Sequence, residues 1–220
     1  MDKVNDIKNI QTLFINDIKS FLQKDKYNLK KNRFIAKSND NIFSIVLNFY
    51  KRPTFIEIQT QSYYGNSRIE SMLMETFSKY EYKEICGGDT RFICEYYFKQ
   101  TYNQQYSNII CNFDTPIIDN IKLWIDNYNK YIKPFFKDCS SPEILNRIVN
   151  EEKIDTTGMN LTYKNRVIKS IFIALLSGQS EFYIINLFKK YEDYLEKKQL
   201  PFLSDFLEIK QNLSAKKYII

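Results

Sequence analysis

Residues 34–60 read FIAKSNDNIFSIVLNFYKRPTFIEIQT, and apolar side chains recur at every second position in three short runs. The polar stretch at 38–41 and the pair Arg52-Pro53 separate these runs. Both are typical of turns, because Asn and Asp tolerate left-handed backbone and Pro fixes φ. The pattern predicts an antiparallel meander of three strands with one buried face. The alternating positions are Phe34, Ala36, Phe43, Ile45, Leu47, Phe49, Ile56, Ile58 and Thr60.

The segments on either side of the meander extend this arrangement. Apolar residues at helical spacing over 3–24 predict an amphipathic helix. Residues 66–79 fit either a short helix, capped by Asn66 or Ser67, or a further strand. After an expected turn at Gly87-Gly88-Asp89, alternation over 92–98 and 106–113 predicts two more strands, for about five in all.

Helical patterns dominate from residue 115 onward. We expect Thr115 and Pro116 to begin a helix that Pro134 ends or kinks. Ser141 and Ser180 are expected N-caps, Gly178 is an expected helix terminator, and a last helix begins at Pro201. The sequence therefore predicts an α+β fold with about five C-terminal helices. Its expected parts are a helix and sheet over 1–114 and a helical region over 115–220, packed as one compact unit.

Charge and composition restrict the chemistry of the chain. There is no histidine among the 220 residues, which excludes a Ser-His-Asp system, a His-ligated zinc site and a His proton shuttle. The first 52 residues carry 11 basic and 5 acidic side chains, so this quarter accounts for the whole formal net charge of +6.

The four cysteines, Cys86, Cys94, Cys111 and Cys139, match no metal or redox spacing. The chain begins without an apolar leader, and its longest apolar run, 171–176, is too short for a bilayer. We expect a cytoplasmic protein with free, buried thiols, no membrane contact, no cofactor and no metal. A Cys86–Cys94 disulfide remains an alternative if residues 87–89 form a hairpin turn.

A basic cluster in the N-terminal segment is the first candidate binding surface. Its side chains could contact phosphates, while Tyr27 and Phe34 could stack on bases of a single strand. The alternative is a solvated helix end followed by an edge strand, where lysines are common. The cluster comprises Lys24, Lys26, Lys30, Lys31 and Arg33.

Paired aromatic residues form the second candidate surface. Tyr63, Tyr64 and Tyr97 could anchor a protein partner, because tyrosine is frequent at interface hot spots. Core packing explains the same pairs equally simply. Two carboxylates on expected strands, Glu57 and Glu95, are the only candidates for histidine-free hydrolysis, and we assign no catalytic residue.

The order of segments resembles a bacterial family of small α+β proteins known only as a domain of unknown function. The chain departs from that family at Lys30-Lys31-Asn32, where the family has a glycine. The resemblance implies the same fold, and a role as an immunity-type or toxin-neutralising protein. The stretches that carry it are 27–34 (YNLKKNRF), 43–49 (FSIVLNF), 131–136 (YIKPFF) and 174–179 (ALLSGQ).

These observations lead to one functional hypothesis and two alternatives. We expect a non-catalytic bacterial protein-interaction module, although its positive charge argues against an immunity protein for a basic nuclease. The first alternative is a protein that binds single-stranded nucleic acid or phosphate through residues 24–37. The second is a carboxylate-dependent hydrolase.

Overall fold

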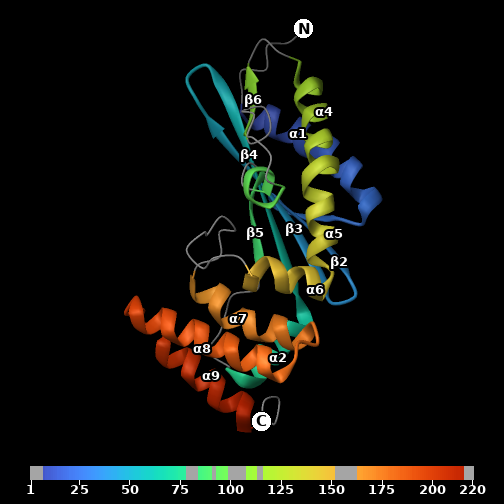
Figure 1. Cartoon of the computed structure of the whole chain (residues 1–220). Coiled ribbons are helices and arrows are strands. Elements are labelled where there is room, and N and C mark those ends of the chain that lie inside the picture. Colours follow the sequence, from blue (N-terminus) through green and yellow to red (C-terminus); the bar gives the residue numbers. More distant parts are fainter. Residues whose placement is uncertain are drawn as a thin grey trace. The chain divides into compact units, whose positions relative to one another are not determined.

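The computed structural model describes residues 7–77, 84–90, 93–98, 108–112, 116–151 and 163–215 (Figure 1). The chain divides into two compact units. Unit 1 comprises residues 1–64 and 87–137, and unit 2 comprises residues 65–86 and 138–220. Each unit is built from two separate segments, so the chain passes between the units three times. The division after residue 114 stays a prediction about which parts of the chain fold together.

The fold is α+β, as predicted, with an N-terminal helix, an antiparallel sheet and then a series of helices. Helix α1 precedes the sheet, whose order is β1-β2-β3-β4-β5, and β6 also pairs with β4. The expected meander is confirmed in β2, β3 and β4. The bounds are α1 (Ile7–Leu22), β1 (Asn28–Lys30), β2 (Arg33–Ser38), β3 (Asn41–Lys51), β4 (Phe55–Asn66), β5 (Cys86–Asp89) and β6 (Asn108–Asn112).

Two tight turns set the register of the first strands. Lys30 pairs with Arg33 across one turn, and Ser38 pairs with Asn41 across the next. Lys31 and Asn39 have φ of 61° and 52° within these turns. A one-residue slip would move every apolar side chain to the wrong face, so these turns fix which face of the sheet is buried.

Helices α1 and α4 (Ile117–Asn127) pack side by side in unit 1 (Figure 1). The α1 face bearing Phe14 and Ile18 is fully buried, and Phe14 packs edge-on against Phe49 of β3 with ring centroids 6.0 Å apart. Trp124 of α4 is also buried, and its indole Nε1 donates a hydrogen bond to Thr60 Oγ1 at 2.9 Å. The predicted apolar face of the meander is therefore the core of unit 1.

Two predictions for residues 87–98 were wrong. Gly87-Gly88-Asp89 is part of β5 rather than a hairpin turn, and a Cβ atom at Gly87 would lie 2.1 Å from the carbonyl oxygen of Ser62. Glycine is needed there for close backbone approach, not for a turn. Residues 93–97 form a π-helical turn rather than a strand. Consecutive Ile93 and Cys94 are both buried, which alternation would not allow.

Pro134 does not end its helix as the sequence suggests. After α4 the chain forms a π-helical turn over Tyr128–Ile132 and continues into α5 (Lys133–Cys139). Pro134 is the second residue of α5 and lies directly after the π-helical turn. Helix α4 begins at Ile117 with Pro116 in the N-cap position, and the expected cap Thr115 lies outside the described residues.

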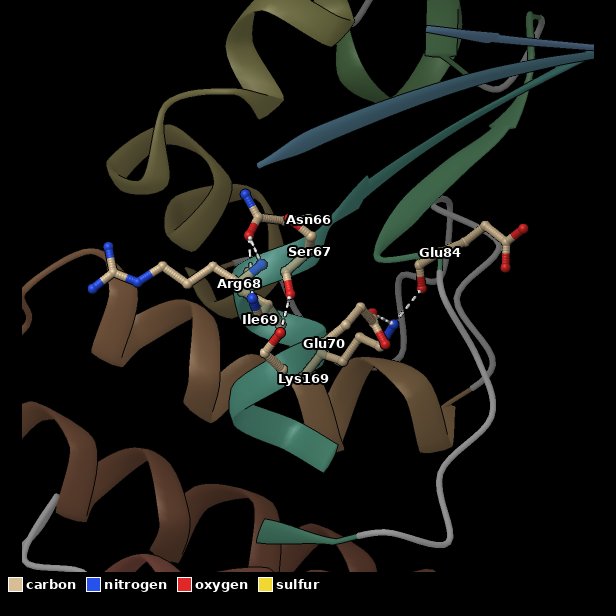
Figure 2. A network of polar contacts seen from close by, with 8 residues as sticks. Asn66, Ser67, Arg68, Ile69, Glu70, Glu84 and Lys169 are labelled. Carbon is tan, nitrogen blue, oxygen red and sulfur yellow. Dashed lines mark hydrogen bonds and ion pairs between the residues drawn. The ribbon is translucent and has the colours of Figure 1, made fainter. Parts of the chain in front are cut away.

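Unit 2 contains most of the later helices, and its helix boundaries follow the predicted signals. The helical alternative for 66–79 is confirmed, because the Asn66 side chain caps α2 by accepting hydrogen bonds from the N–H groups of Arg68 and Ile69 (Figure 2). Ser141 and Ser180 are N-caps, as expected. The bounds are α2 (Ser67–Thr76), α6 (Pro142–Asn146), α7 (Tyr163–Leu176), α8 (Glu181–Lys197) and α9 (Leu203–Ala215), with a π-helical turn at Arg147–Glu151.

Helix α7 is the central element of unit 2. Its residues from Val167 to Ala174 are all buried, and both α8 and α9 pack against it. Gly178 follows the end of α7 with a φ of 67°, the left-handed conformation that commonly terminates a helix. None of the helices in the described ranges is long and apolar enough to cross a bilayer.

Candidate anion-binding site

A cavity of about 370 Å³ lies in unit 1, where three parts of the chain meet. A single 3₁₀ turn after α1 contributes Lys24 and Lys26, and Lys26 has the left-handed φ of 64° that turns the chain toward β1. The hairpin of β2 and β3 contributes one wall, and helix α5 contributes another. The lining residues are Lys24, Asp25, Lys26, Tyr27, Ala36, Lys37, Ser38, Phe43, Tyr128, Lys133, Phe136 and Lys137.

Five ammonium groups and one carboxylate surround this cavity, so its charge is strongly positive. Lys133 pairs with Asp25 at 2.9 Å. The other four side chains are exposed, and within the described part of the chain none of their ammonium groups has an ion-pair or hydrogen-bond partner. These four, which we call the unpaired lysines, are Lys24, Lys26, Lys37 and Lys137.

The single carboxylate of the cavity is already engaged. Lys133 Nζ donates to both oxygens of Asp25 at 2.9 Å, and the Tyr128 hydroxyl donates to Oδ2 at 2.7 Å. Burial raises the pKa of Asp25, but these two donors together hold it below its ordinary value. Asp25 therefore stays ionised and orients Lys133, and it does not neutralise the unpaired lysines.

The inner surface of the cavity is apolar and aromatic. Phe43 is half-buried, and its ring lies 5.2 Å from that of the buried Phe136 between centroids. Burial raises the pKa of both Tyr27 and Tyr128, so their phenol groups remain neutral. The cavity thus combines aromatic surface with a rim of positive charge, an arrangement suited to a ligand that has an apolar ring and anionic groups.

The structure divides the basic cluster predicted from the sequence. Lys24 and Lys26 line the cavity, whereas Lys31 lies in the β1–β2 turn and is exposed. Lys30 and Arg33 are cross-strand partners. They share a sheet face with Val46, opposite the face on which Phe34 pairs with Ile45. Neither Lys30 nor Arg33 is among the residues that line the cavity.

The three tyrosines predicted as partner-binding residues have different surroundings. Tyr64 is only 1% exposed and its hydroxyl donates to Asn41 Oδ1 at 2.7 Å, so the core alternative holds for this residue. Tyr63 is half-buried, and its hydroxyl donates to Gln61 Oε1 at 3.1 Å on the open face of the sheet. Tyr97 is half-buried beside Phe98 and Phe135.

Sequence reasoning did not identify Lys133 and Lys137 as parts of the site. Lys133 and Lys137 are four residues apart on one helix and therefore share a face. That spacing was a usable signal for a positive helix face. No local pattern indicates that this face lies beside residues 24–37, about a hundred positions earlier in the sequence.

The remaining candidates do not form a second reactive centre among the described residues. Glu57 is paired with Arg52 at 2.6 Å and also accepts a hydrogen bond from Asn108. The side chain of Glu95 lies outside the described residues, so the two-carboxylate hypothesis stays a prediction. The four cysteines are free and buried, as expected, and Cys86 lies beside Cys139. No group of three or more acidic or thiol side chains is placed to hold a metal within the described ranges.

No family model, no curated protein and no solved structure matches this chain. The chemistry of the cavity is therefore the basis for a functional proposal. The family resemblance stays a prediction.

Proposed function

We propose that unit 1 binds a nucleotide unit in the cavity, either as a free nucleotide or as part of a single-stranded nucleic acid. The unpaired lysines would hold the phosphate groups, and the ring surface of Phe43 and Phe136 would accommodate the base. The observation that supports this most is the group of four exposed ammonium groups that have no partner among the described residues. They surround an aromatic cavity whose lining carboxylate, Asp25, is already engaged.

The arrangement of these lysines is unfavourable without an anion. Lys133 and Lys137 are like charges one helical turn apart, a spacing that destabilises a helix. A phosphate group that contacts several of these ammonium groups would relieve the repulsion while releasing counterions.

The size and chemistry of the cavity fit binding rather than catalysis. A volume of about 370 Å³ lies in the range of small-ligand sites. Lysine acts as a compact positive charge, and aromatic rings stack on any base. The Asp25–Lys133 pair would orient one cation toward the ligand. Asp25 itself stays ionised and its oxygens are occupied by donors, which gives it little capacity to act as a base.

Three probes distinguish the ligand sources: inorganic phosphate, a free adenine nucleotide and a short single-stranded oligonucleotide of mixed sequence. We expect the nucleotide and the oligonucleotide to bind more tightly than phosphate alone, because only they contribute a base. The charge-reversed variant Lys24→Glu with Lys37→Glu should lose most of this affinity in fluorescence anisotropy or calorimetry.

A matched control keeps the same change in net charge but places it in unit 2. Lys189 and Lys197 lie exposed on α8, and the variant Lys189→Glu with Lys197→Glu should bind like the unchanged protein. Equal loss of affinity in both variants would mean that the net charge of the protein, and not the cavity, determines binding. Absence of binding by all three probes at low salt would reject the proposed function.

The interaction-module hypothesis has its own supporting surface on the open face of the sheet. Tyr50 is 43% exposed there and accompanies Gln59, Gln61 and Tyr63, so this face offers tyrosine and amide groups to a protein partner. We propose this as a second candidate function, including its immunity-type form, in a bacterial cytoplasm that would keep the four thiols reduced. Capture of a host protein that is lost with Tyr50→Ala, but retained with Lys24→Glu and Lys37→Glu, would support it.

A further inference from the structure

Two cysteines of unit 2 lie in direct contact. Cys86 is the first residue of β5, Cys139 is the last residue of α5, and their Sγ atoms are 3.4 Å apart. Both side chains are at most 1% exposed. The contact joins positions 53 residues apart in the sequence, so it depends on the folded structure of unit 2.

The surroundings of this pair differentiate the two sulfurs. Burial and the hydrogen bond with Cys86 raise the pKa of Cys139 well above its ordinary value, so Cys139 keeps its proton. Lys169 interacts electrostatically with Cys86. The Lys169 ammonium donates to Glu70 Oε1 at 2.5 Å and to the carbonyl oxygen of Glu84 at 3.0 Å (Figure 2). In the oxidation of cysteine the thiolate, rather than the thiol, is the nucleophile.

We propose that Cys86 and Cys139 are a site of oxidative modification, and that they form a reversible intramolecular disulfide when the protein meets hydrogen peroxide. The Cys86 thiolate attacks one peroxide oxygen and the O–O bond breaks, which leaves a sulfenic acid on Cys86 and a hydroxide that takes up a proton. The Cys139 sulfur then attacks the Cys86 sulfur. The S–O bond breaks and water leaves with the Cys139 proton. Two thiols are oxidised, and one peroxide is reduced to two waters.

The geometry requires only a local adjustment. A disulfide bond is about 2.05 Å long, so the two sulfurs must approach each other by a little over 1 Å. Because the pair is buried, the oxidant reaches it only during local opening, so the reaction is slow. The contact between the two sulfurs favours a disulfide between them over other products. By comparison, burial raises the pKa of Cys111 to about 12, so this thiol is a poor nucleophile.

The position of the pair in the chain gives the disulfide a structural consequence. Residue 86 ends the first segment of unit 2, and residue 139 is the second residue of the other segment. A bond between them would link the two segments of this unit covalently. Cross-links across long stretches of chain restrict the unfolded state, so the oxidised protein should melt at a higher temperature than the reduced protein.

Peptide mapping without reduction tests the proposal on the full chain after treatment with hydrogen peroxide. We expect a peptide pair cross-linked through Cys86 and Cys139, with two hydrogen atoms fewer than the separate peptides. Dithiothreitol should reduce the cross-link and restore the two free thiols. Cys139→Ser should instead leave a sulfenic acid on Cys86 that dimedone traps. Cys86→Ser should lose the cross-link entirely, whereas the control Cys111→Ser should retain it.

Circular dichroism of each variant separates a loss of cross-linking from a loss of folding. The proposal would be overturned if all four thiols still reacted with an alkylating agent after peroxide treatment. A cross-link through Cys94 or Cys111, or one between molecules, would also overturn it. The proposal is independent of the anion site, since Lys24→Glu with Lys37→Glu should form the same disulfide.

Discussion

Several lysines of unit 2 have partners within the fold, whereas the unpaired lysines of unit 1 have none among the described residues. In unit 2, Lys169 donates to Glu70, Lys190 to the carbonyl oxygen of Asn150, and Lys210 to Glu192. In the cavity of unit 1, four lysines are exposed and have no such partner within the described residues. The same residue type therefore stabilises the fold in one unit and remains available to a ligand in the other.

Burial explains why Lys169 has partners within the fold. The side chain of Lys169 is 1% exposed, and desolvation lowers its pKa below the ordinary value despite the opposing effect of Glu70. A buried ammonium without a partner would be very costly, so the fold must supply one. Water solvates an exposed ammonium at little cost, so an exposed lysine can remain unpaired until an anion arrives.

The largest expected effect on stability comes from removing the carboxylate that pairs with the buried Lys169 of unit 2. Glu70→Ala leaves the buried Lys169 ammonium without its carboxylate, and we expect unfolding to become easier by about 3 kcal/mol. Denaturant unfolding measures this difference. The control Glu196→Ala removes an exposed carboxylate of α8 and should change stability by no more than about 0.5 kcal/mol. Equal effects of the two substitutions would show that burial of Lys169 is not what makes its partner necessary.

A smaller change in folding stability is expected in unit 1 when the pH is raised. The pKa values of Tyr27 and Tyr128 are raised above their ordinary value of 10.0, so the unfolded chain loses these phenol protons at a lower pH than the folded chain. The unfolded state therefore binds fewer protons above about pH 10, and stability must fall as the pH rises. Tyr128→Phe should reduce this alkaline loss, measured as the denaturation midpoint between about pH 9 and pH 11. An unchanged slope would contradict the assigned burial of Tyr128.

The smallest expected change in stability concerns the unpaired lysines. Lys24→Glu with Lys37→Glu should alter the free energy of unfolding by about 0.5 kcal/mol or less, because these exposed side chains have no partner in the part of the chain that the structure describes. The same denaturant experiment measures it. A loss of 2 kcal/mol or more, on the order of a broken buried contact, would mean that these lysines have a structural role.

Local patterns in the sequence predict much of this fold. Asn66, Ser141 and Ser180 cap helices as expected, and alternation from Phe34 to Thr60 identifies three strands. These features depend on neighbours within a few positions. Gly87 was misassigned because its small size serves contact with the distant Ser62, which no local pattern reveals.

The candidate site was predictable only in part for the same reason. Lys24, Lys26 and Lys37 lie in the segment 24–37 that the charge pattern identified and they line the cavity, whereas Lys30 and Arg33 of the same segment do not. Residues of α5 join the site through tertiary packing, so a sequence without an alignment holds no signal for their proximity.

The dependence of oligonucleotide binding on salt tests the anion site most directly. If four lysines each neutralise a phosphate, the logarithm of the association constant should fall against the logarithm of salt concentration with a slope of about −3. Lys24→Glu with Lys37→Glu should bind more weakly and with a slope near half that value. A slope close to zero in the unchanged protein, or the same slope in both proteins, would contradict the assignment of these lysines to a phosphate-binding cavity.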